Sequence, residues 1–274
     1  MRAFARAAAR SGEAELIMGE EAYDEVTPSP TLEPFVEKLW SYRADAPSGT
    51  VQRIVPDGCC ELILHLGAPY EEQAPDGSWG IQPRVLFAGQ LTRPLALRPT
   101  GPVRVLAARF TPDGPRPFLG RPLSQATDRT LDMAGRLPCT PSDLAGLSEG
   151  LDRLRHKEGW AVHPDVRAAL GGAAPAVGPR TLQRAFLDRV GVSLQTIRSI
   201  RRFRQVFGRA EHPDVSARDW LSAGLEAGYF DQPQLARDFR RFLGCTATEW
   251  AREQVELART LATESYKTDP AERP

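Results

Sequence analysis

Hydrophobic positions recur with two different periods along this chain. Around residues 60–66, Cys60, Leu62, Leu64 and Leu66 alternate with Glu61, Ile63 and His65, a period of two that predicts a strand with one buried face. Further strands are expected at 36–43, 85–88, 95–98 and 103–110, with turn signals such as the Pro-Asp-Gly sequence at 56–58 between them. This pattern predicts a small antiparallel β-barrel or sandwich over residues 20–137.

Helical spacing of apolar residues takes over in the second half of the chain. Leucines at 144, 147, 151 and 154 predict a helix within a linker that we place at 138–162. Over residues 232–243, one stripe is apolar and the opposite face is polar. The apolar stripe contains Leu235, Phe239, Phe242 and Leu243, and the polar face contains Gln234, Arg237, Arg240 and Arg241. Pro233 suits the first turn of such a helix, and Gly244 can end it.

A short helix with an apolar back and an Arg/Gln front suits insertion into the major groove of DNA, because Arg pairs with guanine and Gln with adenine. The same pattern also fits an amphipathic surface helix whose arginines are simply solvated. The chain contains a second copy of the pattern: TLQRAFLDRVGVS at 181–193 matches QLARDFRRFLGCT at 234–246 in its Leu, Arg, Phe and Gly positions. Two basic-fronted helices in tandem favour DNA reading.

Composition bounds the class of protein. The chain has 274 residues, 41% hydrophobic and 26% charged, which is ordinary for one or two globular domains. No run of about 18 apolar residues predicts a membrane span. Its four cysteines are scattered, which fits a reducing cytoplasm. The net charge is zero overall, but residues 178–244 hold 12 Arg against 7 Asp and Glu, as expected if one part of the chain meets nucleic acid.

The β-rich region lacks the residues of an enzyme site. His65 is its only histidine, whereas a metal centre usually needs several converging ligands. Cys59, Cys60, Glu61 and His65 could be drawn as a metal or redox site, but adjacent strand residues point to opposite faces, so a buried structural cysteine is favoured. No nucleophile motif, P-loop or dinucleotide fingerprint is present. We therefore expect no catalytic residues, no metal and no cofactor.

Residues 180–250 are similar to the DNA-binding domain of the AraC/XylS transcriptional regulators, which holds two helix-turn-helix units joined by a long helix. The phrase GYFDQPQLARDFR at 228–240 resembles the signature of the second unit, and GVSLQTIRSIRRF at 191–203 resembles the junction after the first. RIVPDGCCELILHLG, FAGQLTRPL and ARFTPDG are similar to the barrel-like, cupin-like sensor domains of one AraC-type subgroup. The resemblance implies an α+β chain, with a β-rich sensor followed by a helical DNA-binding domain.

The resemblance also implies roles for particular side chains. The recognition helices would lie near 179–190 and 232–243. Base contacts are implied for Arg180, Gln183, Arg184, Gln232, Gln234 and Arg237, each giving about 1–3 kcal/mol of discrimination when bidentate. Phosphate contacts are implied for Arg201, Arg202, Arg240 and Arg241, which would set register and salt dependence.

The sequence departs from the family pattern in two ways, one affecting the first helix-turn-helix unit and the other the stability of the second. A helix-turn-helix needs a scaffold helix before its recognition helix, but only HPDVRAAL and GGAAPAVG precede Pro179. The first unit is therefore expected to be truncated, unless HPDVRAAL substitutes for the missing helix. Gly224 stands where the family usually has Ala, at a cost of about 0.5–1 kcal/mol in a helix. Ala223, Gln234 and Leu194 also depart from the pattern, so we expect an intact but less stable second unit and reduced DNA affinity.

These observations predict a transcription regulator that binds double-stranded DNA and carries out no chemistry, with a β-rich domain that senses a small-molecule ligand or mediates homodimerisation. The DNA-binding domain is placed at 163–256. The terminal segments 1–19 and 257–274 are expected to be disordered, the first being either a true extension or the product of a start codon called before Met18. Two alternatives stay open. One is a degenerate regulator that acts as a protein-interaction or dimerisation module, and the other is a barrel enzyme with a DNA-binding tail.

Overall fold

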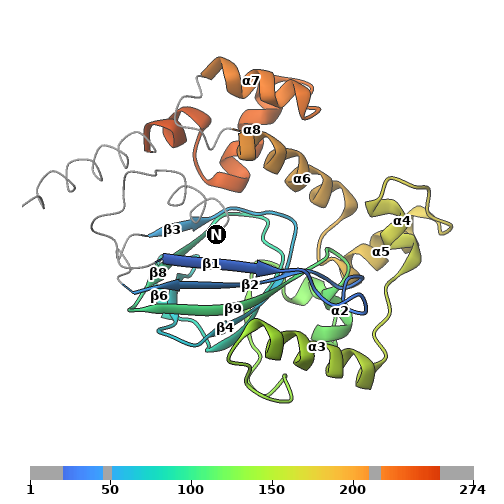
Figure 1. Cartoon of the computed structure of the whole chain (residues 1–274). Helices are drawn as coiled ribbons and strands as arrows, with labels where there is room; N and C mark the ends of the chain where they lie inside the picture. The colour runs from blue at the N-terminus through green and yellow to red at the C-terminus, as the bar shows by residue number, and fades with distance from the viewer. Residues whose placement is uncertain (1–20, 46–50, 210–216, 254–274) are drawn as a thin grey trace, which may run out of the picture. The chain divides into compact units, whose positions relative to one another are not determined.

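The structure is a computed structural model that describes residues 21–45, 51–209 and 217–253 (Figure 1). The two expected disordered termini, 1–19 and 257–274, lie outside the described residues. The described chain forms two compact units, one ending at Ile200 and one beginning at Arg201. Each unit is treated by itself below. The unit boundary falls inside one helix, whereas the sequence suggested a division near residue 163.

Two antiparallel sheets form the β-rich part of the first unit. The strands are β1 (Glu21–Val26), β2 (Val36–Ala44), β3 (Gln52–Ile54), β4 (Glu61–His65), β5 (Tyr70–Gln73), β6 (Trp79–Ile81), β7 (Val85–Ala88), β8 (Leu95–Pro99), β9 (Val103–Phe110) and β10 (Thr130–Asp132). The larger sheet has the order β1-β2-β9-β4-β7-β10 and the smaller sheet β3-β8-β5-β6. Within the described residues no strand of one sheet pairs with a strand of the other, so the fold is a sandwich and the closed-barrel alternative is wrong.

The hydrophobic core lies on one face of the larger sheet. Leu39, Leu62 and Ala108 are fully buried there. They lie opposite one another on three neighbouring strands, so their side chains point to the same face of the sheet. This face packs against α3 (Leu144–Glu158), which follows the leucine spacing seen in the sequence. The short helix α2 (Pro115–Leu119) adds Phe118, whose ring lies 5.3 Å from that of Phe110. The 3-10 turn η1 (Leu123–Gln125) follows α2.

Two further helices complete the first unit. They are α4 (Pro164–Leu170) and α5 (Pro179–Arg189), and α6 (Leu194–Arg209) then runs across the unit boundary. Val166 of α4 and Phe186 of α5 are both fully buried in one small cluster with Ile197 of α6. The stretch HPDVRAAL thus forms a helix that covers the apolar face of α5.

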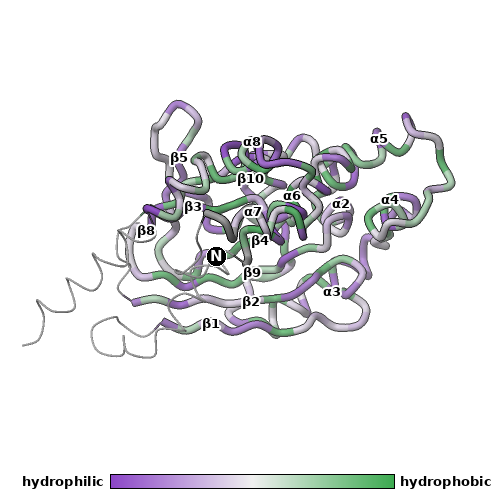
Figure 2. The backbone as a smooth tube through the Cα atoms, turned by 90° about the horizontal axis from the view of Figure 1, so that it is seen from above, coloured by the Kyte–Doolittle hydropathy of each residue, from purple (hydrophilic) through white to green (hydrophobic). Residues whose placement is uncertain are grey.

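The second unit is built around aromatic rings. Its helices are the end of α6, α7 (Ala217–Glu226) and α8 (Gln232–Leu243). The ring of Phe239 on α8 lies edge-on to Trp220 of α7 at 4.9 Å and to Phe203 of α6 at 5.1 Å. Edge-to-face pairs are favoured by the ring quadrupole and add to the stabilisation from burial. The hydrophobic and hydrophilic positions along these helices can be followed in Figure 2.

No helix among the described residues is long and apolar enough to cross a membrane.

We expect Phe239→Ala to lower the free energy of unfolding of the second unit by about 3–5 kcal/mol, because it removes a fully buried ring from between Phe203 and Trp220. Urea unfolding followed by tryptophan fluorescence measures this change. Arg237→Ala, two residues earlier on the exposed face, is the control and should change stability by no more than about 0.5 kcal/mol. Equal midpoints for the two variants would contradict the assignment of this core.

Candidate nucleic-acid interface

A helix-turn-helix is formed by α7 and α8. The five residues 227–231 join the two helices. Gly228 has φ 87, a left-handed conformation that glycine adopts without steric cost, and it ends α7. Tyr229 turns inward and is 4% exposed. The turn therefore directs the start of α8 away from α7 while Tyr229 fixes it to the core.

The first turn of α8 is capped by side chains. Asp231 has an extended backbone, and its Oδ1 accepts a hydrogen bond of 2.7 Å from the Gln234 N–H. The side-chain Oε1 of Gln234 accepts one of 3.1 Å from the Phe230 N–H. Such caps satisfy N–H groups that have no partner within the helix. Gln234 is one of the residues predicted to contact a base. Its side-chain oxygen is occupied by the cap, and its side-chain NH2 group remains to donate a hydrogen bond.

The exposed face of α8 carries the other predicted DNA contacts. Gln232, Arg237, Arg240 and Arg241 are all exposed. Arg241 lies over the ring of Phe242, with its guanidinium carbon 4.9 Å from the ring centre. The buried face carries Leu235, Phe239, Phe242 and Leu243. The two faces predicted from the sequence are therefore separated by burial, and the cationic face is the one left to solvent.

Arg202 takes a different place from the one expected for a phosphate contact. Its guanidinium lies 4.4 Å from the Tyr229 ring centre and 3.6 Å from Asp238 Oδ2, and its side chain is 25% exposed. Tyr229 donates a hydrogen bond of 2.9 Å to the same Asp238 oxygen. Burial and the Asp238 charge raise the pKa of Tyr229, which keeps its hydroxyl protonated. These three residues tie α6, the turn and α8 together, a contact that no pattern in the sequence indicated. Arg201 is half-buried.

Gly224 has a packing reason that the helix propensity did not reveal. It is buried on α7, and a Cβ added there would approach Leu235 Cδ2 to 2.8 Å. Glycine therefore leaves room for the end of the Leu235 side chain, and a small movement of that side chain would accommodate a methyl group here. The unfavourable propensity of glycine within a helix accompanies a close approach, so the departure from the family pattern is part of the packing of the unit.

The other predicted recognition helix, α5, belongs to the first unit. Arg180, Gln183 and Arg184 are exposed on it, as base contacts would need to be. No helix occurs in residues 171–178, the segment directly before α5. The scaffold helix of the family pattern is absent there, as the sequence predicted, and α4 packs on α5 through Val166 and Phe186 in its place.

Polar contacts hold α4 and α5 against the β-rich part of the same unit. Arg167 of α4 donates to both carboxylate oxygens of Asp113, at 3.1 and 2.9 Å, and also to the Pro34 carbonyl. Asp113 is 2% exposed, so its carboxylate is shielded from water, whereas the Arg167 side chain is 39% exposed. Arg116 of α2 donates to Asp188 of α5 at 2.9 Å.

A neutral hydrogen bond also holds the residues just after α5 against the β-rich part. The Thr127 hydroxyl donates to the Gly191 carbonyl at 2.8 Å. Together with the two ion pairs, it makes α5 a fixed element of the β-rich unit. Sequence reasoning missed all of these pairs, because each joins residues that are far apart in the chain.

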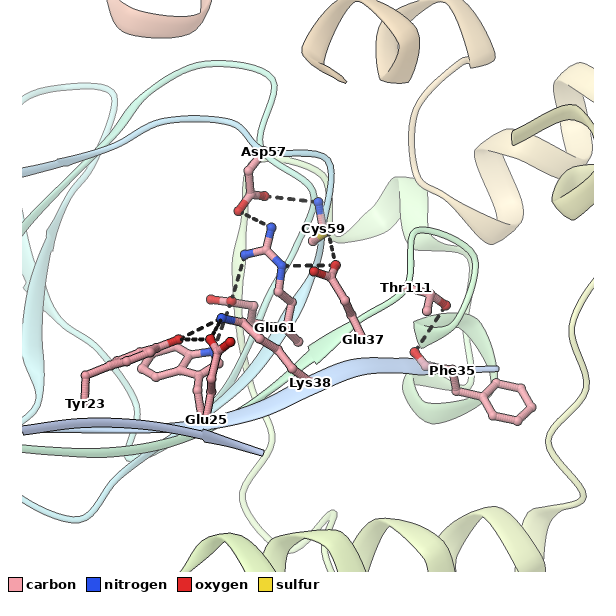
Figure 3. Close-up of polar contacts among 11 residues, drawn as sticks. Tyr23, Glu25, Phe35, Glu37, Lys38, Asp57, Cys59, Glu61 and Thr111 are labelled. Atoms are coloured by element: carbon pink, nitrogen blue, oxygen red, sulfur yellow. Dashed lines mark hydrogen bonds and ion pairs between the residues drawn. The ribbon is translucent and has the colours of Figure 1, made fainter. Parts of the chain in front are cut away.

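A cluster of charged residues occupies the face of the larger sheet opposite the hydrophobic core (Figure 3). The Arg109 guanidinium lies 2.6 Å from Asp57, 3.4 Å from Glu37 and 3.4 Å from Glu61. Trp40 also donates to Glu61, at 3.3 Å. Burial raises the pKa of Glu61, and the Arg109 charge opposes that rise.

A second polar group lies along the same sheet face. Lys38 is 7% exposed and donates to Tyr23 and Glu25 at 2.7 and 2.6 Å. His65 is 4% exposed and contacts Gln82 at 3.2 Å, and its Nδ1 has no hydrogen-bond partner. These polar side chains lie on the same sheet face as the buried apolar residues Trp40, Leu86 and Ala107, so the inner layer of the sandwich is mixed in polarity.

The cysteine cluster considered from the sequence does not converge on one point. Cys60 is buried in the hydrophobic core, while Cys59 lies on the charged side with its Sγ 3.6 Å from Glu37. Burial raises the pKa of both thiols, which makes them poor nucleophiles and metal ligands. Among the described residues, no group of three or more His, Cys, Asp or Glu is placed to hold a metal ion.

We expect Asp231→Ala to destabilise the second unit by about 1 kcal/mol, because the Gln234 N–H loses its cap. Chemical denaturation of the purified protein measures the change. Gln232→Ala alters the next residue, which is exposed and outside the cap, and should leave the midpoint almost unchanged. A similar loss in both variants would show that the cap is not the cause.

The burial of His65 generates a pH prediction. Burial lowers its pKa from the ordinary value of 6.5, so the folded state keeps the ring neutral while the unfolded chain takes up a proton. Stability should therefore fall as the pH drops below about 6.5, with a slope of at most about 1.4 kcal/mol per pH unit from this group. His65→Gln should show a shallower loss between pH 7.5 and 5.5 in urea unfolding. Parallel curves for the two proteins would count against a neutral buried ring.

Comparison with known proteins gives limited matches. Residues 24–132 match a family described as a domain of unknown function, DUF6597. No curated protein sequence matches the chain.

Two solved structures show a remote likeness to the chain. One is the Cupin_2 domain of an XRE-family transcriptional regulator from Enterobacter cloacae, with 20% identity over 33% of this chain and 96% of that one, and a TM-score of 0.25. The other is ToxT from Vibrio cholerae, with 8% identity over 84% of this chain and 98% of that one, and a TM-score of 0.40.

Proposed function

We propose that this protein is a sequence-specific, DNA-binding transcription regulator of the AraC/XylS type, acting in the cytoplasm, with α8 as its main base-reading helix. One observation carries the proposal. The capped helix α8 follows a turn typical of helix-turn-helix units, buries an aromatic face and presents Gln232, Arg237, Arg240 and Arg241 to solvent. In a major groove, Gln and Arg pair with adenine and guanine edges, and further arginines bind phosphates.

Individual roles follow from these positions. Gln232 and Arg237 contact bases from the first two turns of α8, and Gln234 contributes only through its amide NH2, because its carbonyl is part of the cap. Arg240 and Arg241 contact phosphates. Arg202 instead braces α8 through Tyr229 and Asp238.

The first unit has a secondary role in this proposal. Arg180, Gln183 and Arg184 project from α5 and contact DNA, but α5 lacks the usual scaffold helix and is held by the β-rich unit through Asp113 and Asp188. Its contacts therefore depend on the β-rich unit. Arg201 is half-buried on α6, at the start of the second unit, and remains a proposed phosphate contact.

The β-rich unit is proposed to sense a small effector and to form a homodimer. Support comes from the few polar side chains of its inner layer, Arg109, His65 and Lys38, which are largely shielded from water among buried apolar residues. A buried titratable layer on one sheet face is typical of a ligand site with few, well-placed polar groups. The protein is proposed to carry out no catalysis, because burial raises the pKa of the Cys59 and Cys60 thiols and makes them poor nucleophiles.

The second candidate is a degenerate regulator that acts as an interaction module, dimerising with an intact relative. The missing scaffold helix before α5 favours this candidate. Without it, the described residues hold a single complete helix-turn-helix, which reads only a short DNA site by itself.

Selection of binding sites from random double-stranded DNA, at low and at physiological salt, separates the candidates. Enrichment of two half-sites about one helical turn apart supports two reading units. A single enriched half-site per chain supports reading by α8 alone. No enrichment at low salt would exclude the DNA-binding function and leave the interaction module.

Two arginine variants test the assignment of faces on α8. Arg237→Ala should relax specificity at one base pair and weaken binding to the selected site by about 1–3 kcal/mol. Arg241→Ala should weaken binding to all sequences alike and reduce the salt slope by about one. Titrations of matched and mutated operators at three salt concentrations measure both effects. The same pattern for both variants would refute the assignment.

A further inference from the structure

Phe230 is the most exposed of the large hydrophobic side chains in the described residues, with 92% of its surface open to solvent. Its neighbour Tyr229 is 4% exposed. The turn thus places one aromatic ring in the core and the next in water. Burying a phenylalanine is strongly favourable, so a ring left in solvent at this point needs a reason outside the unit.

The position of Phe230 is fixed even though its ring is free of intramolecular packing. Its N–H donates to Gln234 Oε1 at 3.1 Å, and the next residue, Asp231, caps α8. A hydrophobic residue just before an N-cap often packs on the fourth helical residue. Here that residue is Leu235, which is 5% exposed and lies against Gly224 of α7. The backbone of Phe230 is thereby held by the cap, and its ring stays exposed to solvent.

The surroundings of Phe230 indicate what covers it. It sits directly before the helix start whose exposed residues are Gln232, Arg237 and Arg240, a cationic face complementary to DNA phosphates. Residues at the N-terminal end of a recognition helix are the ones that reach base edges. The apolar feature on a major-groove edge is the 5-methyl group of thymine, which Phe can contact.

We propose that Phe230 packs against the 5-methyl group of one thymine in the operator and is a specificity-determining residue. This inference rests on the proposed DNA-binding function and adds a base preference that arginine and glutamine do not provide. The contact needs no rearrangement of the protein, because the backbone of Phe230 is already fixed by the α8 cap.

Replacing thymine by deoxyuridine tests the contact, because it removes the methyl group and changes nothing else on the groove edge. Each thymine of the selected operator is replaced in turn, and affinity is measured for the wild-type chain. One position should lose about fourfold in affinity, the worth of one buried methyl group. Phe230→Ala should bind the thymine and deoxyuridine operators equally, at the affinity that the wild type shows for deoxyuridine.

Leu225→Ala is the matched control, since Leu225 is an exposed apolar residue of α7, 57% exposed. It should retain the wild-type response to deoxyuridine. Far-UV circular dichroism of both variants checks that the fold is kept.

The inference is overturned if the wild type tolerates deoxyuridine at every position, or if Phe230→Ala still discriminates thymine from deoxyuridine. It is also overturned if Phe230→Ala binds all operators as the wild type does, which would leave the ring to a protein partner. These results differ from failure of the proposed function, in which the wild type enriches no DNA sequence at all and Phe230 loses its assigned ligand.

Discussion

The edge-on packing of Phe239 between Trp220 and Phe203 is the constraint on which the second unit depends. A helix of 12 residues is marginal alone in water, so its stability comes from burying this face. Once Phe239 is inside, the helical period leaves Arg237 and Arg240 outside. The contact that stabilises the unit therefore also determines which side chains remain available to DNA.

In the first unit, the short helix α5 also depends on burying its apolar face, but against different partners. Phe186 of α5 is fully buried with Val166 of α4, and the bidentate pair of buried Asp113 with Arg167 holds α4 against the β-rich part. A buried carboxylate without its partner is strongly unfavourable, so this pair specifies how α4 docks. The apolar face of α5 is thus covered although no scaffold helix precedes it.

Periodicity predicted the regular elements because it reports burial directly. The alternation at 60–66 became β4, and the stripe of Leu235 and Phe239 became the inner face of α8. The exposure of Arg237 and Arg240 on α8 followed from the same stripe. The sequence could not predict contacts between residues that are far apart in the chain. Examples are the ion pair of Arg116 with Asp188 and that of Arg202 with Asp238. Whether the strands closed into a barrel was likewise undecided, since no local pattern reveals which strands pair.

The cap formed by Gln234 and Phe230 has a consequence for how binding specificity can evolve. Gln232 and Arg237 are exposed and have no structural task, so substitutions there can change base preference at almost constant stability. Gln234 differs, because its carbonyl completes the helix start and a replacement that alters base preference also loosens the cap. If α8 reads DNA as proposed, substitution should be free at the first two positions and confined, at the third, to side chains that can accept a hydrogen bond.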